Sequence, residues 1–257
     1  MSAAGSVRLE RRDAVAWLVL DRPEARNALT VPMRHRAIEL LAEAESDDDV
    51  GVIALTGAGE HFCGGGDVAS MPEVGDVWEA RARTATAHAV VTALRAAEKP
   101  TIAVARGAVA GLGISLFAAC DVRLAAADAR FQPGFPGVGL IPDGGLLHLL
   151  PRLIGLGRAS EWLLLDHAIG AAEALSWGLA SRVAEADELD ALAGEVAARL
   201  ARVPRRTAAL TKAGLRLAAD ASWESVAEFE RTAQGALLAD PESRALVRAF
   251  LGLDQAT

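Results

Sequence analysis

The stretch KPTIAVARGAVAGLGISLFAACD, residues 99–121, organises the rest of this chain. Residues 101–104 are apolar or β-branched, which predicts a short strand buried on both faces. Three glycines between residues 107 and 113 indicate a turn with positive φ or very close contacts to the backbone. Residues 114–120 are almost entirely apolar, as in a helix buried all round. A strand, a glycine turn and a helix N-terminus together favour binding of negative charge, either a bound anion or an oxyanion formed during a reaction.

Predicted strands and helices alternate along most of the chain. Two short segments near the N-terminus alternate apolar and polar residues, which predicts a hairpin. A second glycine-rich turn, HFCGGGDV, follows a buried strand, and its Asp67 is placed to cap a short helix. The fold class is therefore α/β, followed by an all-helical C-terminal region. Strands are expected at residues 7–11, 15–20, 52–56, 101–104, 122–125, 130–131 and 180–183, and helices at 31–44, 78–98, 114–120, 146–153, 159–165, 171–176 and 189–202, with three more in 205–253.

Composition limits the possible partners. The chain has 257 residues, 52% of them hydrophobic, and a net charge of -8, so we expect one sizeable globular core and no nucleic-acid or anionic membrane partner. Its longest apolar run is well short of the ~20 residues that span a bilayer. Cys63 and Cys120 lie in apolar or glycine-rich sequence without metal spacing, which favours buried thiols over a disulfide. We expect a cytoplasmic protein.

Several motif searches give negative results. Residues 111–116 contain only the first two glycines of a dinucleotide fingerprint, and Ser115 lies in an apolar helix without the second glycine of a nucleophile elbow. A buried helix serine is the simpler interpretation of Ser115. The five histidines are too dispersed for a zinc site, so no metal is expected.

Five blocks, in this order, resemble the enoyl-CoA hydratase/isomerase (crotonase) family over nearly the whole chain. They are RPEARNAL at 22–29, HFCGGGDV at 61–68, the segment from residue 99 to 131, GLIPDGG at 139–145 and ALSWGLASRV at 174–183. The resemblance implies a crotonase-like spiral of repeated ββα units that binds acyl-CoA, at residues 1–200. It also implies a helical oligomerisation region at 201–257, giving a homotrimer or a dimer of trimers. No separate cofactor is expected, because CoA is part of the thioester substrate.

By the same resemblance, the backbone N–H groups of Gly66 and Leu112 form an oxyanion hole for the thioester carbonyl. Each lies in a glycine turn before a helix, where fixed donors can stabilise an enolate as it forms. Leu112 stands where the family often has glycine, but a backbone donor survives that change. The alternative is that these glycines serve only tight turns.

The resemblance also places CoA on two neighbouring loops. Arg26 is a candidate to neutralise phosphate, and the segment Gly64, Gly65, Gly66, Asp67 and Val68 is expected near the adenine. The alternative is that Arg22 and Arg26 are ordinary surface charges.

The departures from the family pattern concern the acid/base groups. Where the family's hydratases carry two glutamates, this chain has Ser115 and Phe135, and neither can act as a carboxylate acid or base. Asp143 instead occupies a position where isomerase members and aryl-CoA dehalogenases place their working carboxylate. We therefore expect an isomerase that shifts a double bond with Asp143 as base, unless Asp143 only caps the helix after Gly145.

Three alternatives remain open at this point. One is a hydratase-type lyase, although it would lack both glutamates. Another is an aryl-CoA dehalogenase, in which Asp143 attacks the ring, His88 activates water and Phe135 lies near the ring; a lone histidine in an alanine-rich helix is more often an ordinary helix residue. The third is a non-catalytic acyl-CoA-binding subunit.

Overall fold

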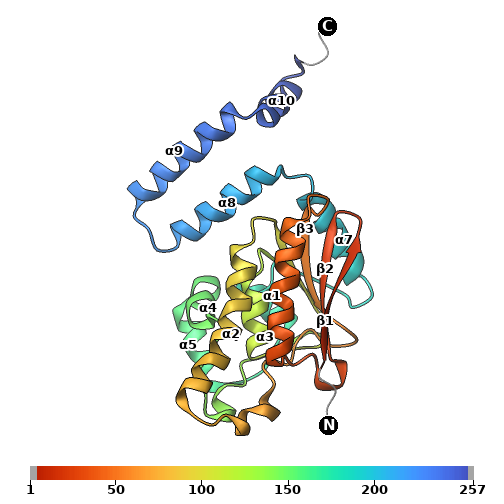
Figure 1. Ribbon diagram of the computed structural model, residues 1–257, viewed down its shortest axis with the longest axis vertical. Coiled ribbons are helices and arrows are strands. Elements are labelled where there is room, and N and C mark those ends of the chain that lie inside the picture. Colours follow the sequence, from red (N-terminus) through yellow and green to blue (C-terminus); the bar gives the residue numbers. More distant parts are fainter. Residues whose placement is uncertain (1–4, 254–257) are drawn as a thin grey trace. The chain divides into compact units, whose positions relative to one another are not determined.

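The computed structural model describes residues 5–253. The described chain divides into two compact units, one ending at Arg202 and the other starting at Val203. All strands in the described residues belong to the first unit, and the second unit is helical (Figure 1). The expected α/β class with a helical C-terminal region is confirmed. The sequence places its domain boundary between residues 200 and 201, close to this division.

A six-stranded sheet forms the centre of the first unit. Its first two strands pair antiparallel, as expected for a hairpin, and all later neighbours pair parallel. In spatial order the strands are β1 (Ser6–Arg12), β2 (Val15–Asp21), β3 (Val52–Gly57), β4 (Thr101–Ala105), β6 (Val122–Ala126) and β9 (Arg182–Ala184).

Helices cover both faces of this sheet, as the apolar strand sequences predict. On one face, alternate side chains of β2, β3 and β4 pack with α1 (Val31–Ser46), α2 (Val77–Ala96) and α3 (Leu112–Ala119), which lie side by side in Figure 1. On the other face, the intervening side chains pack against α7 (Leu189–Leu200). The remaining helices of the unit are α4 (Leu146–Ile154), α5 (Leu156–Leu165) and α6 (Ala171–Trp177), with 3-10 turns η1 (Pro23–Ala25), η2 (Val68–Glu73) and η3 (Pro136–Val138).

The sequence predicted that a buried strand leads through a glycine turn directly into a helix, and this is wrong. A second, three-stranded sheet contributes a short strand between them. It contains β5 (Ala108–Ala110), β7 (Arg130–Gln132) and β8 (Ile169–Gly170), and β5 lies inside the predicted glycine turn. This segment forms a strand because β7 pairs with it and Cys63 also bridges to Val109. The chain enters β5 at Gly107 and leaves it at Gly111, both with positive φ.

Capping explains where two of the long helices begin. The Thr30 side chain accepts a hydrogen bond from the Met33 N–H, as expected, and Asp76 caps α2 in the same way. Asp67 precedes η2, but its side chain caps nothing there because it binds Arg22 instead. The expectation that Asp67 caps a short helix is therefore wrong.

The second unit consists of the three helices expected from the sequence. They are α8 (Arg205–Ala218), α9 (Trp223–Ala239) and α10 (Pro241–Phe250). Asp240 caps α10 and also pairs with Arg206 of α8. Neither α9 nor α10 contains a buried residue. Among the residues described in both units, no helix is long and apolar enough to cross a membrane.

Candidate active site

Two glycine turns touch each other at the end of the central sheet. A Cβ atom added to Gly65 would lie 3.1 Å from the Ala110 carbonyl oxygen, and one added to Gly111 would lie 3.7 Å from the Gly65 Cα. Both glycines have positive φ. Hydrogen bonds from the Cys63 N–H to the Ala108 carbonyl, at 3.1 Å, and from the Ala110 N–H to the Cys63 carbonyl, at 2.9 Å, hold the turns together. The positive φ of both residues and the short distance at Gly65 favour glycine where the two backbones meet.

Each turn presents a backbone donor that the protein itself does not use. Leu29 pairs with Gly65 and Asp67, so the Gly66 N–H between them faces the other way. Leu112 is the first residue of α3 and has no carbonyl one turn earlier in that helix. Within residues 5–253, neither N–H donates a hydrogen bond. Two free donors on adjoining turns can stabilise a carbonyl oxygen as it becomes negative.

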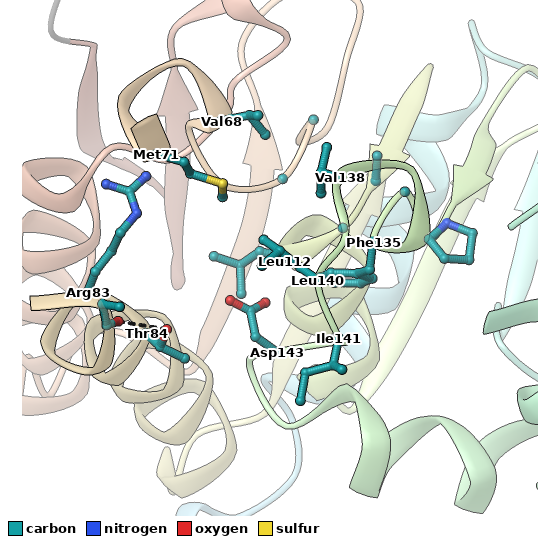
Figure 2. Close-up of a pocket in the computed structure, with 18 of the residues that line it drawn as sticks. Val68, Met71, Arg83, Thr84, Leu112, Phe135, Val138, Leu140, Ile141 and Asp143 are labelled. Carbon is teal, nitrogen blue, oxygen red and sulfur yellow. Dashed lines mark hydrogen bonds between the residues drawn. The ribbon is translucent and has the colours of Figure 1, made fainter. Parts of the chain in front are cut away.

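A cavity of about 300 Å³ opens beside these two turns. Its wall is mostly apolar and comes from η2, from α2 and from the loop between β7 and α4 (Figure 2). Val68 and Met71 approach from η2, whereas Phe135, Val138 and Leu140 approach from the loop. Of the residues proposed from the sequence, seven line it: Gly64, Gly65, Gly66, Val68, Leu112, Phe135 and Asp143.

Asp143 extends its carboxylate into this cavity beside Leu112 (Figure 2). Its backbone carbonyl accepts hydrogen bonds from the Ser115 hydroxyl, at 2.9 Å, and from the Leu146 N–H, at 3.1 Å. Its Oδ1 atom is buried and has no hydrogen-bond partner in the described chain. Burial raises the pKa of Asp143, and electrostatic interactions with Arg34 and His88 oppose that shift only in part. Gly145, not Asp143, is the N-cap of α4, and no side chain caps that helix, so the capping alternative is excluded.

No second carboxylate lines the cavity among the residues that the structure describes. Ser115 is fully buried in α3, as the buried-serine interpretation predicts, and its hydroxyl donates a hydrogen bond to the Asp143 backbone carbonyl. Phe135 is an apolar part of the wall. The cavity therefore contains one carboxylate with a raised pKa and, on adjoining turns, two backbone N–H groups that make no hydrogen bond in the described chain.

Three residues proposed from the sequence do not line the cavity. Arg26 is exposed, and its carbonyl accepts a hydrogen bond from the Gly64 N–H at 2.6 Å, so its side chain starts next to the glycine turn. Asp67 forms an ion pair with the buried Arg22 at 3.0 Å. Arg22 is thus not a surface charge. His88 lies on the exposed side of α2 yet is near enough to Asp143 to lower its pKa.

Two arginines that the sequence reading missed also line the cavity, Arg34 from α1 and Arg83 from α2. A signal existed for Arg34. It lies three residues before Ala37 and seven before Leu41, both buried, which places a charge on the apolar face of a helix. The second wall position, Arg83, gave no such signal because its helix is rich in arginine and alanine throughout.

Known proteins resemble this chain over most of its length. Residues 10–255 match the family model for enoyl-CoA hydratase/isomerase. The chain is 34% identical over 228 residues to 4-chlorobenzoyl coenzyme A dehalogenase-2 from Arthrobacter sp., covering 87% of this chain and 82% of the relative. It is 30% identical over 241 residues to trans-2-decenoyl acyl-carrier-protein isomerase from Streptococcus mutans, covering 93% of this chain and 92% of the relative. The crystal structure of an enoyl-CoA hydratase from Polaromonas sp. JS666 superposes with a TM-score of 0.93 at 30% identity, covering 96% of this chain and 97% of that chain.

Proposed function

The chain belongs to the enoyl-CoA hydratase/isomerase family, and from this premise we propose that it shifts a double bond in an unsaturated acyl-CoA, with Asp143 as the base. It is an enzyme of that family. Similar sequences carry the names of a dehalogenase and an isomerase, and a similar structure that of a hydratase, so the reaction must be argued from the site. The proposal rests on one observation: Asp143 is the only carboxylate of the described residues that lines the cavity.

A double-bond shift needs one base that both removes and returns a proton. In the proposed reaction the Asp143 carboxylate takes a proton from a carbon next to the thioester, or from the carbon vinylogous to it. The electron pair of that C–H bond moves into the conjugated system and onto the thioester oxygen. The N–H groups of Gly66 and Leu112 would donate hydrogen bonds to this oxyanion. Each donor of this kind contributes ~3 kcal/mol of transition-state stabilisation. Asp143 then returns the proton at the other end, and the double bond has moved.

The apolar wall supports this assignment of the base. Hydration needs a second acid/base group to position a water molecule, and Ser115 and Phe135 supply none. The raised pKa of Asp143, caused by burial, makes it a stronger base than an exposed aspartate. CoA enters as part of the substrate, so the proposed proton transfer needs no other group. We further propose that exposed Arg26, beside Gly64, meets a phosphate of CoA.

A second candidate is displacement of halide from an aryl-CoA, favoured by the similarity to the Arthrobacter dehalogenase and by the aromatic wall at Phe135. Asp143 would attack the ring carbon, chloride would leave, and water would hydrolyse the resulting aryl ester. His88 would have to activate that water, but it is exposed on α2 and does not line the cavity. This candidate is therefore the weaker one.

The test compares three substrates, 3-enoyl-CoA, 2-enoyl-CoA and 4-chlorobenzoyl-CoA, with products separated by chromatography and identified by mass spectrometry. We expect interconversion of the enoyl isomers, and we expect Asp143→Asn to lower kcat by about 10³-fold while thioester binding changes little. Asp128→Asn, at an exposed carboxylate in the turn after β6, is the matched control and should leave kcat unchanged. Rapid water addition that survives Asp143→Asn would refute the proposal, and thioester binding without any turnover would favour a non-catalytic subunit.

A further inference from the structure

We propose that Arg34 is a positioning residue of this site: its buried guanidinium braces the Gly66 peptide against α2 and supplies the positive charge that faces Asp143. The effect on turnover rests on the proposed function. The coupling between the two side chains does not, because it can be measured without substrate.

The guanidinium of Arg34 connects three segments that build the cavity. Its Nη1 donates to the Arg83 carbonyl oxygen at 3.0 Å and to the Thr86 hydroxyl at 3.2 Å, both in α2. Its Nη2 lies 3.4 Å from the Leu29 carbonyl, in the segment that pairs with the Gly66 turn. A Cβ atom added to Gly66 would lie 2.9 Å from this Nη2. The guanidinium therefore fills the space that a side chain at position 66 would occupy, and it fixes the peptide whose N–H is the proposed oxyanion donor.

Arg34 is also a buried charge without a carboxylate partner in contact. Its exposed fraction is 2%, it forms no ion pair within 4 Å in residues 5–253, and its Nε atom is buried without a hydrogen-bond partner. An unpaired buried charge is costly, so packing alone would favour a neutral side chain of similar length at this position. Burial and the neighbouring Arg83 lower the pKa of Arg34, whereas Asp143 raises it. Guanidinium pKa values are high enough that the group still stays charged.

Asp143 shares the cavity wall with Arg34 of α1 and Arg83 of α2. The charge of His88 on α2 also acts on Asp143, and the neutral Ser115 of α3 donates to its backbone carbonyl. Burial raises the pKa of Asp143, and among the groups that lower it Arg34 acts most strongly, ahead of His88 and Arg83. Arg34 thus favours the ionised form of the partly buried Asp143, and it supports the peptide of the proposed oxyanion donor. One guanidinium would therefore act on both the proposed base, Asp143, and the proposed oxyanion donor, the Gly66 N–H.

The first test measures the coupling by thermal unfolding, with no substrate present. Asp143→Asn is made in the wild-type and in the Arg34→Met background, and the change in Tm is followed from pH 3 to pH 9. In the native protein the pKa of Asp143 is raised, so replacing it stabilises the fold as pH rises above the ordinary value of about 3.9. Without Arg34 this gain should become larger, and it should level off about one pH unit higher. Identical pH curves in the two backgrounds would overturn the proposal.

The second test measures turnover and includes rescue and control variants. Arg34→Met should move the acidic limb of the kcat profile to higher pH by about one unit, so kcat below that limb falls about tenfold. Arg34→Lys should restore the position of the limb. Arg123→Met removes another partly buried arginine that binds backbone carbonyls, at Leu179 and Cys120, and should cost stability without moving the limb.

Failure of this inference can be separated from failure of the proposed function. If Arg34→Met does not fold, Arg34→Gln keeps N–H donors but no charge, and the same measurements apply. A uniform loss of kcat at every pH with the limb unmoved would overturn the electrostatic part of the proposal, and would leave Arg34 only the bracing of the Gly66 peptide. The Tm change caused by Asp143→Asn could depend on Arg34 as expected in a protein that isomerises no enoyl-CoA. That result would support the inference and refute the proposed function.

Discussion

Two aspartates beside the cavity show how environment decides the role of a residue. Asp143 is partly buried, its buried Oδ1 atom has no hydrogen-bond partner in the described chain, and its pKa is raised. Asp67 is also partly desolvated, which alone would raise its pKa, but the hydrogen bond and the charge of Arg22 outweigh this and hold its pKa below the usual range. The first arrangement makes a base at the expense of stability, and the second ties the glycine turn to the loop that carries Arg22.

We predict that Asp67→Asn destabilises the fold at neutral pH and much less in acid. A lowered native pKa contributes stability above the unfolded value of about 3.9, and this is lost as pH falls through the native value. The substitution also removes the ion pair between Asp67 and the buried Arg22, at a cost of about 1–2 kcal/mol in the free energy of unfolding. Urea titrations at pH 7 and pH 3 measure this.

The control for that prediction is Asp21→Asn. Asp21 pairs with Arg8 at 3.1 Å, but solvent reaches both side chains, which are 34% and 46% exposed, so the change should stay below about 1 kcal/mol. Equal losses at positions 67 and 21, or a loss at position 67 that does not depend on pH, would contradict the assignment.

At the scale of elements, the sequence predicts a helix or strand correctly where the local pattern of residues is enough to specify its conformation. The buried β4, the capped α1 and the three C-terminal helices follow from apolar pattern and capping residues. The strands β5 and β8 could not be predicted, because two or three residues carry no periodicity and both depend on pairing with β7. The same limit applies to the site: the glycine turns were visible, but the approach of Arg34 from α1 depends on tertiary packing.

The packing of α3 gives a prediction at this scale. Gly113 lies in its first turn, and a Cβ atom there would come within 2.4 Å of the Cys63 carbonyl oxygen. Gly113→Ala must push α3 away from the other glycine turn and move the Leu112 N–H with it. We expect a loss of several kcal/mol in unfolding free energy and a fall of at least about tenfold in kcat, measured by urea titration and by steady-state kinetics.

Gly194→Ala provides the matched control for α3. Gly194 lies inside α7 and has no atom within 4 Å of its added Cβ, so alanine should stabilise the protein by roughly 0.5–1 kcal/mol. Full activity of Gly113→Ala would show that the position of α3 does not set the donor.

For the whole molecule, the second unit raises the question of what covers its apolar side chains. On α10, Leu246 and Val247 lie four and three residues before Phe250, so both share a helix face with it. Phe250 is 90% exposed. Trp223 and Leu238 of α9 are also exposed. An apolar helix face of this kind is typical of an interface. The covering partner that we propose is another copy of this chain.

We predict a closed homotrimer, or a dimer of two such trimers, whose contacts come largely from the C-terminal helices. The number of subunits follows from the family resemblance. A closed ring covers the apolar face of every copy, whereas an open chain leaves one face uncovered at its end. Light scattering at micromolar concentration should give three or six times the 26.7 kDa of one chain. Leu246→Asp combined with Phe250→Asp should reduce that mass, because each buried carboxylate would lack a partner. Thr92→Asp, at an exposed polar residue of α2, is the control and should leave the mass unchanged. A wild-type protein with the mass of one chain would exclude the assembly, and would leave the apolar face of α10 to a different partner.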